Sequence, residues 1–140
     1  MSVVYFTDRD LGNQFPDILA TAGLSVHRHR DHFAPNCPDE EWLAEIGHQG
    51  WVAVTHDRRI RYKPNELDAV KTHRVSLLVV VGNAPFAQLA EAFVRTEGKV
   101  VQFLERNPPP LIAKVHRPSP ADLARNPETG GRVERWYPKL

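Results

Sequence analysis

Three aspartates, Asp8, Asp39 and Asp57, are the residues of this sequence whose types and spacing suggest chemistry. Asp8 follows the apolar and β-branched run 3–7, and Asp57 follows a similar run at 51–55. Runs that are apolar at every position indicate buried strands, and ligands bind at the carboxyl ends of parallel strands. If the two strands are neighbours, the carboxylates of Asp8 and Asp57 lie about 5 Å apart. Asp39 opens a predicted helix, and we expect it beside them.

Three carboxylates that meet at one point repel one another, so that one of them takes up a proton unless a cation is present. A hard divalent cation such as Mg²⁺ removes this repulsion, because it prefers carboxylate and water oxygens and phosphate. Such a cation activates water and stabilises the charge that develops in phosphodiester cleavage. The pattern therefore predicts that Asp8, Asp39 and Asp57 are both the metal ligands and the catalytic residues.

A basic segment follows the third of these acids and contains Arg58, Arg59 and Arg61. Runs of charge are most often solvated loops. The position directly after Asp57 gives an alternative, in which the three arginines contact the phosphates of RNA.

Simpler interpretations of the same residues remain open. Asp8 and Asp39 both stand where a helix begins, and aspartate is among the favoured N-cap residues. His27, His29 and His32 suggest a zinc site, for which the sequence shows no fourth ligand.

Composition limits the classes of protein to which the chain can belong. With 140 residues, one domain is expected, and the net charge of +1 favours no particular partner. A single cysteine, Cys37, excludes a disulfide framework and a zinc cluster of thiolates. There is no apolar run of membrane-spanning length and no signal-peptide pattern, so we expect a cytoplasmic protein without a membrane partner.

Short apolar runs alternate with helical patterns along the chain, which is typical of α/β proteins with parallel strands and right-handed crossovers. The expected strands are 3–7, 25–29, 51–55, 75–82 and 111–115, and the expected helices lie at 11–22, 38–47, from 64 onward and at 85–106. The sequence thus predicts a domain at 1–117 with five strands. The Pro- and Arg-rich tail, 118–140, is expected to pack on the same domain.

Three segments, 6–11, 38–43 and 54–60, resemble the three acidic motifs of PIN-like domains, in order and with similar spacing. The closest likeness is to short toxins of the VapC type from bacterial toxin–antitoxin pairs, and it covers residues 3 to 115. This resemblance implies a PIN-like α/β/α sandwich with a mostly parallel five-stranded sheet. It further implies an endoribonuclease dependent on Mg²⁺ or Mn²⁺, with RNA as its substrate and a protein antitoxin as its partner. A homodimer is a further expectation.

The chain departs from the family pattern after Asp57. Related sequences often carry a second acid and then an aromatic residue where this chain has Arg59 and Ile60. A fourth acid is also usual in the family, and the candidates for it are Asp10, Asp31 and Glu40; of these, Asp10 and Glu40 are the expected supporting acids.

Two other classes of function remain as alternatives. The first is a PIN-like module that has lost catalysis and binds RNA or protein, which Arg59 in place of an acid suggests. The second is a receiver-like signalling domain. That class needs a lysine after the fifth strand, whereas Lys114 lies inside it, so the receiver pattern fits poorly.

Overall fold

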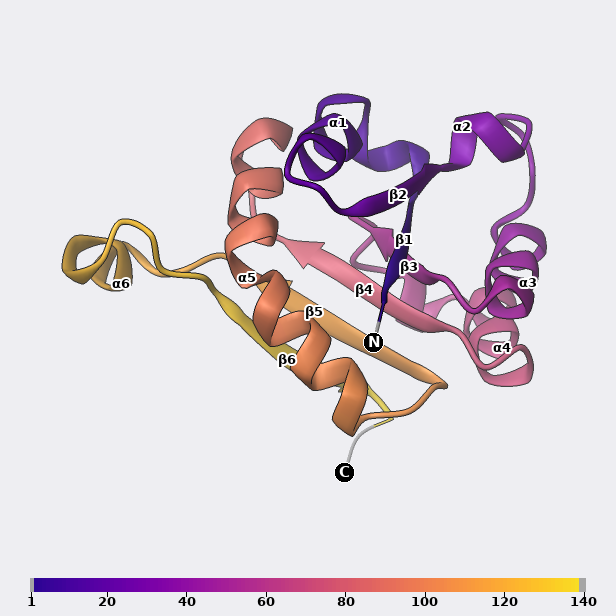
Figure 1. Cartoon of the computed structure of the whole chain (residues 1–140). Coiled ribbons are helices and arrows are strands. Elements are labelled where there is room, and N and C mark those ends of the chain that lie inside the picture. Colours follow the sequence, from indigo (N-terminus) through magenta and orange to yellow (C-terminus); the bar gives the residue numbers. More distant parts are fainter. Residues whose placement is uncertain (1, 139–140) are drawn as a thin grey trace.

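The computed structural model describes residues 2–138, which form a six-stranded sheet between layers of helices (Figure 1). The strand order is β2-β1-β3-β4-β5-β6. The first five strands in sequence run parallel, and β6 is antiparallel to β5. The strands are β1 (Val4–Thr7), β2 (Ser25–Arg28), β3 (Val52–Thr55), β4 (Ser76–Val81), β5 (Leu111–His116) and β6 (Arg132–Tyr137).

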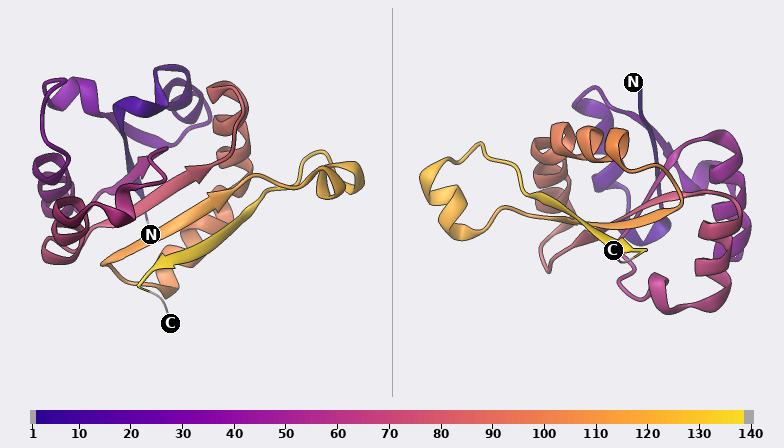
Figure 2. Two further views of the ribbon diagram at one scale, coloured as in Figure 1. Left: turned by 180° about the vertical axis from the view of Figure 1, so that it is seen from behind. Right: turned by 90° about the horizontal axis from the view of Figure 1, so that it is seen from below.

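Helices cover both faces of this sheet, and each face has its own apolar core (Figure 2). One face packs against α1 (Gln14–Thr21) and α5 (Phe86–Arg106), and the other against α3 (Asp39–Gln49) and α4 (Pro64–Thr72). The shorter elements are α2 (His29–His32), α6 (Pro120–Arg125) and the 3₁₀ turns η1 (Arg9–Leu11) and η2 (Ile60–Tyr62). The predicted three-layer α/β/α class is confirmed.

Strand β1 illustrates why these runs form central strands. Tyr5 points into one core, where its ring meets that of Phe93 edge-on at 5.4 Å. Phe6 points into the other core, where its ring lies 5.4 Å from that of Trp42. A strand with apolar side chains on both faces is stable only between two layers, so β1 and the fully buried β3 take interior positions in the sheet. The more polar β2 lies at an edge, as its composition suggests.

Helix α3 begins after Pro38 and carries three acids in its first turn, a composition that suits the positive end of the helix dipole. Trp42, Leu43 and Ile46 are fully buried. The helix ends at Gly50, whose φ of 71° lies in the left-handed region that favours glycine. The first residue of this helix is Asp39, so the buried stripe also fixes where Asp39 lies.

The prediction of five strands is wrong by one, because the tail contributes β6. Its residues Arg132–Tyr137 pair with β5, and Val133 and Trp136 pack against the two cores. Its sequence, Arg-Val-Glu-Arg-Trp-Tyr, does not alternate regularly between polar and apolar residues, so the pattern did not indicate a strand. The predicted tail also contains α6, while residues 139–140 lie outside the described part of the chain.

Two further boundaries differ from the prediction. The second strand ends at Arg28, and His29 opens the short helix α2 within the segment expected to be strand and loop. Among residues 2–138, no helix has both the length and the apolar character needed to cross a membrane.

Candidate active site

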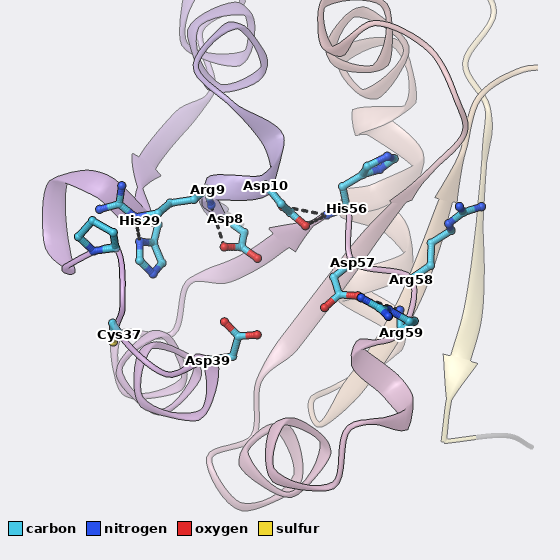
Figure 3. A pocket seen from close by; sticks show the side chains of 11 residues that line it. Asp8, Arg9, Asp10, His29, Cys37, Asp39, His56, Asp57, Arg58 and Arg59 are labelled. Carbon is cyan, nitrogen blue, oxygen red and sulfur yellow. Dashed lines mark hydrogen bonds between the residues drawn. The ribbon is translucent and has the colours of Figure 1, made fainter.

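The carboxyl ends of β1 and β3 border a cavity of about 600 Å³ (Figure 3). The two strands are neighbours, and the N–H of Asp8 extends their pairing by donating to the carbonyl of Val54 at 2.9 Å. Four acids line the cavity together with basic and neutral residues: Asp8, Asp10, Asp39, Asp57, Arg9, Arg58, Arg59, His29, His56, Pro35 and Cys37. The sheet topology thus brings the three predicted aspartates to one pocket.

Asp8 has both of the roles that its position suggested, because it caps a turn and also lines the pocket. Its Oδ1 accepts a hydrogen bond from the N–H of Arg9 at 2.7 Å, which makes it the N-cap of η1. Its Oδ2 accepts from the hydroxyl of Thr55 at 2.9 Å. Burial raises the pKa of Asp8 to about 7, and the negative charges of Asp10 and Asp39 add to this effect. Without a cation, Asp8 therefore takes up a proton at a much higher pH than an ordinary aspartate does.

Asp10 is the acid whose place in the site the sequence left open. Its carboxylate accepts from the Thr55 hydroxyl at 3.0 Å and from the N–H of His56 at 3.1 Å. Burial away from water raises the pKa of Asp10, although these hydrogen bonds oppose the shift. The other two candidates for a fourth acid, Asp31 and Glu40, are absent from the described lining of the pocket.

Asp39 faces Asp8 across the pocket (Figure 3). Its Oδ1 accepts a hydrogen bond from the indole N–H of Trp42 at 2.9 Å, one turn further along α3. The interpretation of Asp39 as an ordinary N-cap is wrong, because the cap position belongs to Pro38. Instead, the hydrogen bond from the buried Trp42 holds the Asp39 carboxylate at the first turn of α3.

Asp57 differs from the other acids because it already has a cationic partner. Its Oδ2 accepts from Lys63 Nζ at 2.6 Å, and its Oδ1 accepts from the N–H of Arg59 at 2.9 Å. Partial burial raises the pKa of Asp57, but the Lys63 hydrogen bond, the Arg59 N–H and the two positive charges outweigh it and hold this pKa below its ordinary value. Asp57 therefore stays ionised where Asp8 takes up a proton.

The acids line one pocket without meeting at one point. Within residues 2–138, no three His, Cys, Asp or Glu side chains are close enough together to hold one metal ion. Asp8 and Asp10 nevertheless lie within 2.9 and 3.0 Å of the same Thr55 oxygen. Mg²⁺ commonly binds one or two carboxylates and completes its shell with water and phosphate, so this pair suits the cation. The metal-binding roles of Asp8, Asp39 and Asp57 stay predictions.

Thr55 is a site residue that the sequence interpretation missed. It is fully buried at the end of β3, donates its one hydroxyl proton toward Asp8 and Asp10, and accepts from the N–H of Asp57 at 3.2 Å. One proton cannot satisfy two carboxylates at once, which adds to the need of this pair for a proton or a cation. A polar residue that ends an otherwise apolar strand, two residues before an acid, was the signal for it.

The three arginines that were predicted to contact RNA do not all lie at the pocket. Arg58 and Arg59 are exposed at the rim of the pocket (Figure 3). Arg61 is absent from the lining, and its guanidinium lies over the rings of Tyr62 and Trp136. Arg9, which the sequence interpretation did not select, lines the pocket and donates to His29 Nδ1 and to the carbonyl of Phe33, both at 2.8 Å.

The histidine cluster takes part in packing. His27 stacks on Trp51 with ring centroids 4.0 Å apart, and its Nδ1 lies 3.0 Å from His32 Nε2. His29 is buried and accepts the hydrogen bond from Arg9. The zinc interpretation has no support in the part of the chain that the structure describes, since His29 is engaged by Arg9 and no suitable group of three ligands occurs there.

The sheet and the acids at its strand ends define a three-layer α/β domain with an anionic pocket. The sequence model of the PIN-like domain matches residues 3–82, which is more than half of the 140 residues, and the chain belongs to this family. The matched region extends from β1 to the end of β4 and includes all four acids of the pocket. Comparisons with curated proteins and with solved structures give no significant match.

Proposed function

We propose that this protein is a metal-dependent endoribonuclease that uses Mg²⁺ or Mn²⁺. The observation that carries the proposal is the pair of carboxylates, Asp8 and Asp10, which share the Thr55 hydroxyl and, among residues 2–138, have no cationic partner of the kind that Lys63 gives to Asp57. Arginines stand at the rim of the same pocket, where an anionic backbone would lie. PIN-like domains are commonly nucleases, so the family and the charge pattern favour the same chemistry.

Asp8 and Asp10 would hold the cation, with Asp39 opposite them. When bound, the cation would neutralise the phosphate oxygens and polarise the phosphodiester for attack by water. Asp39 is fixed by the Trp42 indole, and Asp8 and Asp10 are oriented by Thr55 and the backbone of His56. The protein therefore supplies carboxylates that are already in place and need little rearrangement.

Asp57 would take part in the reaction once its partner, Lys63, binds the substrate instead. A phosphate at the pocket would compete with the Asp57 carboxylate for Lys63, which is half exposed and donates to Asp57 at 2.6 Å. Lys63 would then bind the substrate, and the Asp57 carboxylate, which lines the pocket, would lose its cationic partner. This exchange assigns Asp57 to the catalytic set together with Asp8 and Asp39.

The proposal is tested by incubating purified protein with labelled RNA in Mn²⁺, in Mg²⁺ and in EDTA. We expect cleavage with either cation and none in EDTA. Since Arg59 replaces an acid that related sequences often carry, the competing function is an RNA-binding module without catalysis. That function would give binding in every buffer and no cleavage in any of them.

The rim arginines give a prediction about binding. Replacing Arg58 and Arg59 together with alanine should weaken the binding of all RNA sequences alike, because arginines that contact phosphates release counterions without reading bases. The slope of log affinity against log salt should fall by about 0.7 for each phosphate that the variant no longer neutralises. Anisotropy titrations over a range of salt measure this slope. An unchanged slope would make both arginines part of a solvated loop.

The biological role that we propose is that of a toxin restrained by a protein antitoxin. The acid pocket is open to solvent, so an active enzyme would degrade cellular RNA unless a partner covered it. A partner could do so by placing an arginine or lysine on Asp8 and Asp10, where a cation would otherwise bind.

Expression of the wild-type chain in a bacterial host should therefore arrest growth. Asp57→Asn should relieve the arrest while the protein remains folded and abundant, as measured by growth curves and immunoblotting. Equal arrest by both proteins would attribute the toxicity to binding or aggregation and contradict the catalytic role.

A further inference from the structure

The helices do not cover the sheet evenly. On the face that packs against α3 and α4, the strand residues of the core come from β1, β3 and β4 together with Ile112 of β5. The same face of β5 and β6 lies beyond these helices and is open toward the viewer in Figure 2 (left). Lys114 follows Ile112 by two residues on β5 and therefore lies on this open face.

A cluster of two aromatic and two cationic side chains borders this open face, and we name Arg61, Tyr62, Lys114 and Trp136 the aromatic platform. The rings of Tyr62 and Trp136 meet edge-on with centroids 5.7 Å apart. Arg61 Cζ lies 5.4 Å from the Tyr62 centroid and 5.6 Å from that of Trp136, and Lys114 Nζ lies 4.5 Å from the Trp136 centroid. Segments far apart in the sequence thus build one surface.

Two properties of the platform point to a ligand. Tyr62 is 67 % exposed, which makes it the most exposed large hydrophobic residue in the described part of the chain. Arg61 and Lys114 have no carboxylate within ion-pair distance among residues 2–138. Contacts within the platform account for the orientation of the cations but leave most of the Tyr62 surface in water. An exposed aromatic ring beside unpaired cations suits a ligand that is both flat and anionic.

The platform is also directly connected to the acid pocket. Its residues Arg61 and Tyr62 belong to η2, which begins immediately after the rim arginines Arg58 and Arg59. Lys63, the next residue after Tyr62, donates to Asp57 in the pocket. A polyanion bound at the rim therefore needs only a short continuation to reach the platform.

We propose that the aromatic platform is a stacking subsite for an unpaired base of single-stranded RNA that extends from the acid pocket. An unpaired base would stack on Tyr62, while Arg61 and Lys114 would contact the adjoining phosphates. Duplex RNA keeps its base faces inside the helix and cannot use this ring. An acidic protein segment would use the two cations but has no need of the exposed tyrosine face. The inference rests on the proposed function, since it defines the substrate as single-stranded.

The test compares wild type with Tyr62→Ala and with the matched control Tyr62→Phe, which keeps the ring. Binding of a short, unstructured, fluorescein-labelled RNA is measured in EDTA, so that cleavage plays no part. The loss of one base stack should weaken binding by roughly 5- to 150-fold in Tyr62→Ala and leave Tyr62→Phe close to wild type. Binding of a blunt duplex of the same sequence should be the same in all three proteins.

Equal affinity of wild type and Tyr62→Ala for the single strand would overturn the proposal, and so would an equal loss for the duplex. An acidic peptide that displaces the RNA and depends on Tyr62 to the same extent would overturn it too, and would assign the platform to a protein partner. Cleavage is scored separately in Mn²⁺. A Tyr62-dependent affinity without cleavage would leave this subsite in place and contradict only the nuclease activity.

Discussion

Replacement of Asp8 by asparagine should lower the rate of metal-dependent RNA cleavage by about 100-fold or more, which corresponds to the several kcal/mol that a divalent cation contributes to such a transition state. Asp8 is the centre of the acid set: it shares the Thr55 hydroxyl with Asp10, and the charges of both Asp10 and Asp39 act on it. Asparagine keeps the shape and one acceptor oxygen but removes the charge that attracts the cation. Single-turnover cleavage in saturating Mn²⁺ measures this loss.

The same substitution should increase the stability of the folded protein when no metal is present and the pH is high. The pKa of Asp8 is about 7 in the folded protein, above its ordinary value near 4, so the folded state binds a proton that the unfolded state releases between these values. The stability of the metal-free wild type is therefore highest below pH 4 as far as this group is concerned, and it falls as the pH rises through 7. Asp8→Asn should remove this fall and unfold at a higher temperature than wild type at pH 8.

The matched control is Asp31→Asn, which makes the same change of charge at an exposed acid outside the pocket lining. It should retain wild-type cleavage and the wild-type dependence of stability on pH. If Asp8→Asn instead destabilises the metal-free protein at pH 8 and cleaves RNA normally, the main role of the Asp8 carboxylate is structural, through its hydrogen bonds from the Arg9 N–H and the Thr55 hydroxyl. Thermal unfolding in EDTA at several pH values separates the two outcomes.

The sequence was sufficient for the parts of the fold that depend on local pattern. Strands β1 and β3 are apolar on both faces, which predicts that both are buried between two layers, and the alternation of strands and helices predicts that they run parallel. Their direct pairing, which brings Asp8 and Asp57 to one edge, was assumed from the sequence and is seen in the structure. The apolar stripe of α3 likewise predicts which face of the helix is buried, whereas the position of Asp39 beside the other acids was an expectation that the stripe alone did not establish. The order of apolar and polar residues in each segment indicates which of its faces are buried.

The remaining features depend on contacts that periodicity does not encode. Lys63 reaches back to Asp57 across the 3₁₀ turn η2, and nothing in a run of basic residues reveals which of them will make such a contact. Arg61 belongs to the same run but turns toward Trp136, a residue of the strand that the sequence interpretation missed. The sequence therefore could not show that Arg61 differs from Arg58 and Arg59, because the difference lies in where the side chains point.

Thr55→Val should impair both the fold and the catalysis, because valine keeps the shape of threonine and removes the hydroxyl. In the folded protein this hydroxyl is the common partner of Asp8, Asp10 and the N–H of Asp57. Leaving such groups without a partner costs about 1–3 kcal/mol, and the loss of a group that orients metal-binding carboxylates typically lowers metal affinity or activity by about 10- to 100-fold. Urea unfolding and kcat/KM in a Mn²⁺ titration measure the two effects.

The pH dependence distinguishes a positioning role of Thr55 from a purely structural one. The Thr55 hydrogen bond lowers the pKa of Asp8 against the larger effect of burial, so its removal should raise this pKa further. Because a proton on Asp8 competes with the cation, the pH below which Mn²⁺ binding weakens should move upward in Thr55→Val relative to wild type. Thr55→Ser keeps the hydroxyl and should show the wild-type pH midpoint despite losing a buried methyl group. If serine shifts the midpoint and valine does not, packing of the methyl group rather than the hydrogen bond positions the carboxylates.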